Sequence, residues 1–171
     1  MNRIAGSPGA VVFRELKRRY VPVVTTLLAI LLGLFPLVVT TPLLPDIGFL
    51  VLLTWRLLRP EVWLPLAALG FGLVDDLVSG HPMGQSMALW TMIFLALDVI
   101  EHRIDYKDFW FDWLYAAMAI FFHTAGAWYI GVLMGSHTPF SQLLPSIAFT
   151  ILAYPMMARL VLGLDRWRLS L

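Results

Sequence analysis

The chain has 171 residues, of which 60% are hydrophobic and only 13% are charged, and its mean hydropathy is +0.80. Soluble domains are about half apolar and carry roughly 25% charged residues, so this composition indicates an integral membrane protein. The formal net charge of +1 gives no signature of nucleic-acid binding, and the lack of cysteine excludes disulfides and thiolate metal sites.

Six apolar segments follow one another along the chain and predict an all-α protein with six transmembrane helices. A spanning helix needs about 20 residues. The first, fifth and sixth segments reach this length, whereas the other three need a thinner bilayer or a recessed position. The segments are Val21–Thr40, Asp46–Leu58, Trp63–Ser79, Gly84–Ile100, Phe109–Met134 and Leu143–Leu162.

The basic residues predict the orientation of these helices. All twelve Lys and Arg residues lie before the first segment, between the second and third, between the fourth and fifth, or around the C-terminal end. Cytoplasmic loops carry the excess of Lys and Arg, so we expect both ends of the chain in the cytoplasm. The three remaining loops, around residues 41–45, 80–83 and 135–141, are then short outer loops.

This topology divides the chain into a cytoplasmic segment at residues 1–20, a six-helix domain at 21–163 and a cytoplasmic tail at 164–171. The first segment is either a helix lying on the membrane surface or an ordinary basic flank of the first span. The basic residues closest to the inner surface form a candidate cytoplasmic interface. They are Arg14, Lys17, Arg18, Arg19, Arg56 and Arg59.

Three acids gather at the outer side, where the chain has no Lys or Arg. Asp46 begins the second segment, and the adjacent Asp75 and Asp76 lie near the end of the third. Their partners must be backbone N–H groups, hydroxyls, histidines, water or a group from another molecule. Two interpretations stay open for these acids: structural hydrogen bonding, or a pocket for a partner or ligand.

A stripe of small residues accompanies the acidic pair. Ala68, Gly72, Asp76 and Gly80 recur at four-residue spacing, which lets membrane helices approach closely. Asp75 is turned about 100° away. We therefore predict that Asp76 is a hydrogen-bonding residue and not an obligatory charge, so that Asn could replace it. A turn is expected to end this helix, with Gly80, Pro82 and Gly84 as its turn residues.

No catalytic or metal-binding spacing is visible in the sequence. The four histidines, at 81, 102, 123 and 137, are scattered, and none belongs to a metal-site motif. His123 is expected to be a hydrogen-bonded packing residue. The sequence predicts a protein that is not an enzyme and has no cofactor.

The run GLVDDLVSGHPMG resembles the signature of the MreD family, the rod shape-determining membrane proteins of bacteria. The family pattern Gly-Leu-x-x-Asp-x-x-x-Gly-x-x-x-Gly matches Gly72, Leu73, Asp76, Gly80 and Gly84. A Pro-Asp near the start of the second helix and an Arg-Pro after it also match, at Pro45–Asp46 and Arg59–Pro60.

This resemblance implies a non-catalytic subunit of the cell-elongation machinery in the bacterial inner membrane. It implies pairing with MreC and support, directly or through MreC, of the RodA glycosyltransferase and a class B penicillin-binding transpeptidase, with MreB filaments as indirect partners. The family is similar in fold to the S components of energy-coupling factor transporters. A ligand-binding S component and a lipid-handling enzyme or flippase are the alternatives, although a flippase should carry an outer cation for phosphate.

Overall fold

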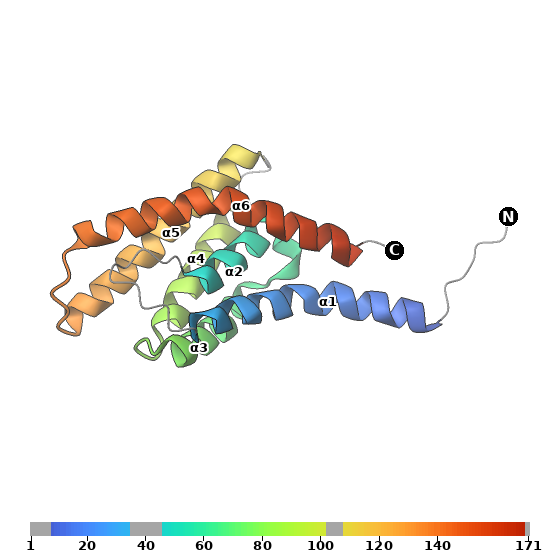
Figure 1. Ribbon diagram of the computed structural model, residues 1–171, viewed down its shortest axis with the longest axis horizontal. Coiled ribbons are helices and arrows are strands. Elements are labelled where there is room, and N and C mark those ends of the chain that lie inside the picture. The colour runs from blue at the N-terminus through green and yellow to red at the C-terminus, as the bar shows by residue number, and fades with distance from the viewer. Residues whose placement is uncertain (1–7, 35–45, 102–107, 170–171) are drawn as a thin grey trace.

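The computed structural model describes residues 8–34, 46–101 and 108–169. Over these ranges the chain forms six α-helices and three short 3-10 helices, with no strand, which confirms the all-α prediction (Figure 1). The α-helices are α1 (Pro8–Leu31), α2 (Ile47–Leu58), α3 (Pro65–Ser79), α4 (Gln85–Glu101), α5 (Phe109–Leu133) and α6 (Leu144–Leu169).

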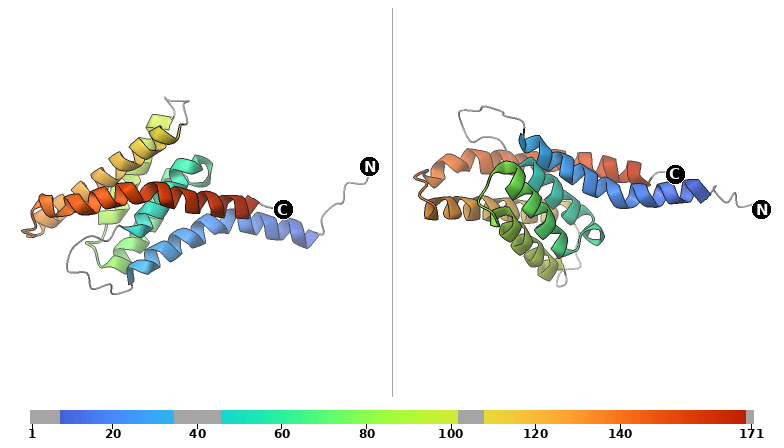
Figure 2. Two further views of the ribbon diagram at one scale, coloured as in Figure 1. Left: turned by 45° about the horizontal axis from the view of Figure 1, so that its top comes forward. Right: turned by 90° about the horizontal axis from the view of Figure 1, so that it is seen from below.

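The helices alternate in direction, so that each end of the bundle collects ends of several helices. One end surrounds a cavity lined by residues at the end of α1, the start of α2, the end of α3 and the starts of α4 and α6. These residues are Gly33, Asp46, Ser79, Gln85 and Ser146. At the far end of the molecule the end of α6 lies beside α1, and the start of α1 projects beyond it (Figures 1 and 2).

Helix α2 forms the centre of the bundle. Every residue from Gly48 to Leu57 is buried, because the helix is apolar apart from Thr54 and Arg56, and helices that are largely apolar on all faces pack inside protein. Its 12 residues rise about 18 Å at 1.5 Å per residue, less than the roughly 30 Å of bilayer hydrocarbon. The short second segment is therefore enclosed by its neighbours, and it does not face lipid with its full circumference.

Two segments of the described chain are long and apolar enough to cross a membrane, Phe109–Leu133 and Phe140–Leu169. Their outer surfaces carry large exposed apolar side chains such as Leu133, Leu152 and Met156. In water these side chains would be costly to expose, but in lipid they are in their preferred surroundings. The composition and these two helices together indicate a membrane protein.

Two helices continue across boundaries that were drawn from the sequence. Helix α1 runs unbroken through residue 20 to Leu31, so the basic segment and the first apolar segment form one helix. Helix α6 extends to Leu169, and residues 164–169 are helix where a tail was expected. Asp165 and Arg168 explain this extension, because both are buried against the rest of the bundle.

Candidate functional site: an acidic cavity at one end of the bundle

The small stripe of α3 packs directly on the backbone of α4. Ala68 is fully buried, and a Cβ added to Gly72 would lie 2.6 Å from both the backbone nitrogen and the Cα of Met87. No real side chain is accommodated at that distance, so only glycine allows this contact. The structure thus places Gly72 where the sequence predicted close helix packing.

Asp76 binds the N-terminus of α4. Its Oδ1 accepts a hydrogen bond from the Ser86 N–H at 2.7 Å, and its Oδ2 accepts from the N–H of Gly84 at 2.8 Å and of Met87 at 3.4 Å. The first N–H groups of a helix have no partner within the helix and carry partial positive charge. Asp76 is 3% exposed, and it satisfies these groups from the neighbouring helix.

This geometry argues against the expectation that Asn could replace Asp76 with little effect. Both carboxylate oxygens accept hydrogen bonds from backbone N–H groups. An amide offers one oxygen acceptor and one nitrogen donor, so an Asn nitrogen would face an N–H group whichever way the side chain were turned. The role of Asp76 in hydrogen bonding stands, but the role requires two acceptors.

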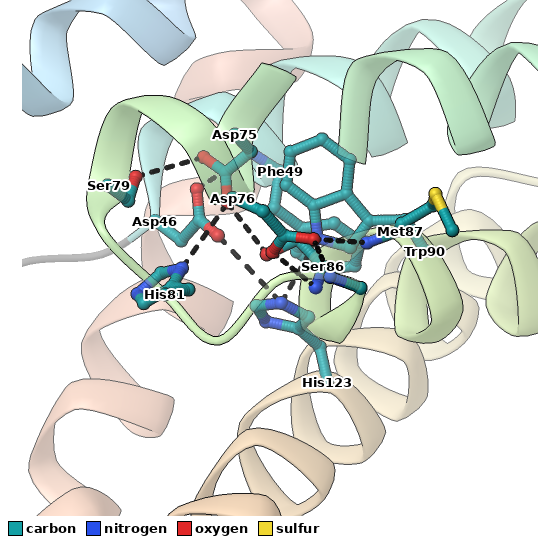
Figure 3. A network of polar contacts seen from close by, with 11 residues as sticks. Asp46, Phe49, Asp75, Asp76, Ser79, His81, Ser86, Met87, Trp90 and His123 are labelled. Carbon is teal, nitrogen blue, oxygen red and sulfur yellow. Dashed lines mark hydrogen bonds and ion pairs between the residues drawn. The ribbon is translucent and has the colours of Figure 1, made fainter. Parts of the chain in front are cut away.

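Asp75 is equally buried and points to a different set of partners. It accepts hydrogen bonds from the hydroxyls of Ser79 at 3.2 Å and Ser86 at 2.8 Å, and it lies 3.5 Å from Nδ1 of His81. Ser86 therefore joins the acidic pair, since its N–H reaches Asp76 and its hydroxyl reaches Asp75 (Figure 3).

Asp46 reaches the same region from α2. It is the N-cap of that helix, and its Oδ1 accepts a hydrogen bond from the N–H of Phe49 at 2.9 Å, which is the usual role of an N-cap Asp. Its Oδ2 lies 3.9 Å from Nε2 of His123. Pro45, which precedes Asp46 in the family motif, lies outside the described residues.

His123 lies against Asp46 but does not form a conventional ion pair with it. The indole N–H of Trp90 donates to Nε2 of His123 at 3.1 Å, and the imidazole stacks on Phe49 with ring centroids 4.4 Å apart. Because Nε2 accepts this bond, it carries no proton to donate to Asp46. His123 is thus a hydrogen-bonded packing residue, as the sequence indicated.

The third titratable partner, His81, lies in the turn between α3 and α4. Its hydrogen bond to Asp75 raises the pKa of His81 above its ordinary value, and the negative charges of Asp75, Asp46 and Asp76 add to this effect. The turn is built on glycines in the left-handed region, with φ of 69° at Gly80 and 96° at Gly84.

The acids border a cavity of about 510 Å³. Its lining takes polar groups from the acidic network and apolar groups from α1, α2 and α5. No Lys or Arg of the described chain lines it. The residues that bear polar side chains are Asp46, Asp75, Ser79, His81, Gln85, His123, Thr124, Ser146 and Thr150.

One group in the described chain has the composition of a metal site. Asp75, Asp76 and His81 each offer a ligand atom, and these atoms lie within 4.8 Å of one another. However, the Asp76 oxygens already hold the backbone of α4, and Asp75 already accepts two hydroxyls. The two carboxylates therefore serve chiefly as hydrogen-bond acceptors, and they make the electrostatic potential around them negative.

The predicted cytoplasmic interface is partly internal, which corrects the sequence analysis. Arg56 is 1% exposed and pairs with Glu101 at 2.7 Å and with Asp98 at 3.3 Å. Arg59 pairs with Asp165 at 2.7 Å. These two arginines hold helix ends together, and Arg56 is too buried to meet a partner, whereas the Arg59 side chain is 38% exposed.

The basic residues of α1 are more accessible. Arg18 and Arg19 are exposed, whereas the ammonium of Lys17 lies 3.9 Å from the ring centroid of Trp167. The side chain of Arg14 lies outside the described part of the structure. Arg18 and Arg19 therefore remain as the exposed part of the candidate interface.

Sequence reasoning missed several members of these networks. The sequence did not indicate the roles of Ser86, Gln85 and Trp90, because these roles depend on how α4 and α5 pack. Asp98 and Glu101 could have been found, since two acids three residues apart at the end of an apolar segment need cations, and Arg56 is at the same end of the bundle.

Fold and site together define an all-helical membrane protein with an acidic cavity and no recognisable catalytic arrangement in its described residues. A family model, described as rod shape-determining protein MreD, matches residues 14–165. The chain therefore belongs to the MreD family, and this membership links it to the determination of rod shape in bacteria. No curated protein and no solved structure matches the chain.

Proposed function

We propose that this protein is a non-catalytic membrane subunit of the machinery that elongates the bacterial cell wall. This proposal rests on the contacts that the residues of the family motif make in the structure. Gly72 sets the contact between α3 and α4, Asp76 binds the first turn of α4, and Gly84 forms the intervening turn. Motif residues used in this way build a rigid helix pair, which suits a scaffold.

In this proposal the protein crosses the inner membrane six times, with both ends in the cytoplasm. The clustering of charged pairs supports this orientation. Arg56, Arg59 and Arg168 lie at the end of the bundle opposite the acidic cavity, and cytoplasmic ends carry the excess of basic residues. The cavity then opens toward the outer side of the membrane.

The proposed partners are MreC and, directly or through MreC, the RodA glycosyltransferase with a class B penicillin-binding transpeptidase. MreB filaments are linked only indirectly. The broad exposed apolar surfaces of α5 and α6 offer area for contact with other membrane helices, and the exposed Arg18 and Arg19 offer charge at the inner surface.

Co-purification and cell shape test this function together. In the bacterium that encodes the protein, a tagged chain should retain cell-wall synthesis proteins, identified by mass spectrometry, and depletion of the chain should turn rods into spheres. Rod shape that persists after complete depletion would contradict the proposal. Retention of an ATPase module instead would identify a transporter subunit.

The S-component alternative is kept because of one observation, the open cavity of about 510 Å³. Ligand pockets have volumes of about 300–1,000 Å³, so its size fits a small molecule. Uptake of a vitamin-sized substrate that depends on this chain would favour the alternative.

A further inference from the structure

The cavity contains polar groups whose hydrogen-bonding capacity is not used within the described residues. Oδ2 of Asp46 receives no hydrogen bond from His123, because Nε2 of His123, 3.9 Å away, is itself an acceptor for Trp90. Gln85 lines the same cavity, is 9% exposed, and its side-chain amide has no partner among the described residues. This side-chain amide is therefore available to bond a molecule that enters the cavity.

The charge around the cavity is also unbalanced. Asp46 and Asp75 line it, Asp76 lies next to Asp75 and binds the start of α4, and no Lys or Arg of the described chain lines the cavity. The one nearby base that can carry charge is His81, whose side chain is 41% exposed. A cation placed among buried carboxylates stabilises their charged form, so a positively charged ligand fits this lining.

We propose that this cavity binds an organic cation, an ammonium or guanidinium group, held by Asp46 and Asp75, with Gln85 bonding a neighbouring polar group of the same ligand. This goes beyond the scaffold function, which requires no ligand. The cation belongs either to a free small molecule or to a basic side chain of a bound protein.

The size of the cavity selects an organic cation over a bare metal ion. A water molecule accounts for about 30 Å³ of liquid, so an ion would leave most of the 510 Å³ as water. The apolar part of the lining, which includes Ile30, Phe49 and Ile120, suits the hydrocarbon portion of an organic ligand. Asp76, the third candidate metal ligand, is already engaged by α4.

The test uses the full chain, purified in detergent, with agmatine and spermidine as probes, acetylated spermidine as a probe of reduced charge, and Mg²⁺ and Mn²⁺ as metal probes. Binding is followed by calorimetry. We expect agmatine or spermidine to bind, and Asp46→Asn to weaken that binding about 10-fold or more, as for loss of a charge-assisted hydrogen bond. Asn is a good N-cap, so α2 should fold in this variant.

Asp108→Asn is the matched control, because Asp108 is the exposed N-cap of α5 and makes no side-chain capping bond. It should leave binding unchanged. Gln85→Leu should weaken binding without altering the charge.

Two further measurements distinguish a free small molecule from a basic side chain of a bound protein. A free ligand should be released from protein purified out of its native membrane, and mass spectrometry should detect an amine that is absent from the Asp46→Asn variant. If the cation belongs to a partner, Asp46→Asn should lower retention of that protein whereas Asp108→Asn should not.

The proposal is overturned if no amine binds and partner retention is the same in both Asn variants. It is also overturned if only Mg²⁺ or Mn²⁺ binds, which would assign a metal site to Asp75, Asp76 and His81.

Discussion

The two ends of the helix bundle bury carboxylates in opposite ways. At the cavity end, Asp75 and Asp76 are held by hydroxyl and backbone N–H groups, which supply hydrogen bonds but no full positive charge. At the other end, Asp165 lies between Arg59 and Arg168, each 2.7 Å away. Arginines therefore balance the charge of the carboxylates only at the second end.

This difference indicates that the two ends have different roles. The arginine end connects α2, α4 and α6 through short ion pairs and leaves Arg56 almost without exposed surface. The acidic end keeps a cavity and an excess of negative charge. We infer that the first end fixes the arrangement of the helices and that the second is the end at which another molecule is bound.

The largest expected effect lies in the helix contact that supports the acidic end. Gly72→Leu should prevent α3 from packing on α4, because a Cβ at this position would already lie 2.6 Å from the backbone of Met87. The protein should fail to accumulate in the membrane, as measured by quantitative immunoblotting of membrane fractions.

Gly70→Leu makes the same exchange on the same helix, at a position with no atom within 4 Å of the added Cβ. It should accumulate as the wild type does. Equal accumulation of the two variants would show that the close approach of α3 and α4 is not required.

The next largest effect should come from breaking the arginine end. Asp165→Ala leaves Arg59 and Arg168 without their shared carboxylate, and removing one partner of a buried ion pair costs about 3–5 kcal/mol. Because the Arg59 side chain is 38% exposed, the lower part of this range applies. Thermal unfolding in detergent measures the loss.

Glu61→Ala is the control for Asp165→Ala. Glu61 also pairs with Arg59, at 3.5 Å, but its side chain is 64% exposed, and exposed pairs contribute about 0–1 kcal/mol. If both variants unfold at the same temperature, the arginine end does not fix the helices as we infer.

Substitutions of Asp76 should destabilise the protein to different degrees. Asp76→Asn keeps one acceptor and places an amide nitrogen against an N–H group of α4, so it should destabilise the protein by about 1–3 kcal/mol. Asp76→Leu removes every acceptor and should be more harmful. Thermal unfolding of the two variants ranks them, and a wild-type melting temperature for the Asn variant would restore the simpler expectation from the sequence.

The sequence predicted the helical class, the stripe at Gly72 and the gathering of acids, because these depend on composition and on helical periodicity. It could not predict that Asp76 holds α4, since that bond joins helices through a turn whose shape follows from the φ of Gly80 and Gly84. It also placed Arg56 on the surface, because charge alone does not reveal Asp98 and Glu101 facing it in space.

The smallest expected effect concerns pH at the acidic end. The hydrogen bond to Asp75 raises the pKa of His81, so protonated His81 stabilises the folded protein. This contribution is complete below the unfolded pKa of about 6.5 and is lost as pH rises through the higher folded value. The side chain is 41% exposed, so screening by solvent keeps the gain below about 1 kcal/mol.

His81→Gln should therefore lower the melting temperature more at pH 5.5 than at pH 8.5, measured relative to the wild type at each pH. His137→Gln, at an exposed histidine outside the network, controls for the loss of an imidazole and should show no such dependence. A bound organic cation would compete with protonated His81 for Asp75, so adding agmatine should reduce the pH dependence of the wild type. An unchanged dependence in protein that binds agmatine would contradict the assignment of Asp75 to the cation site.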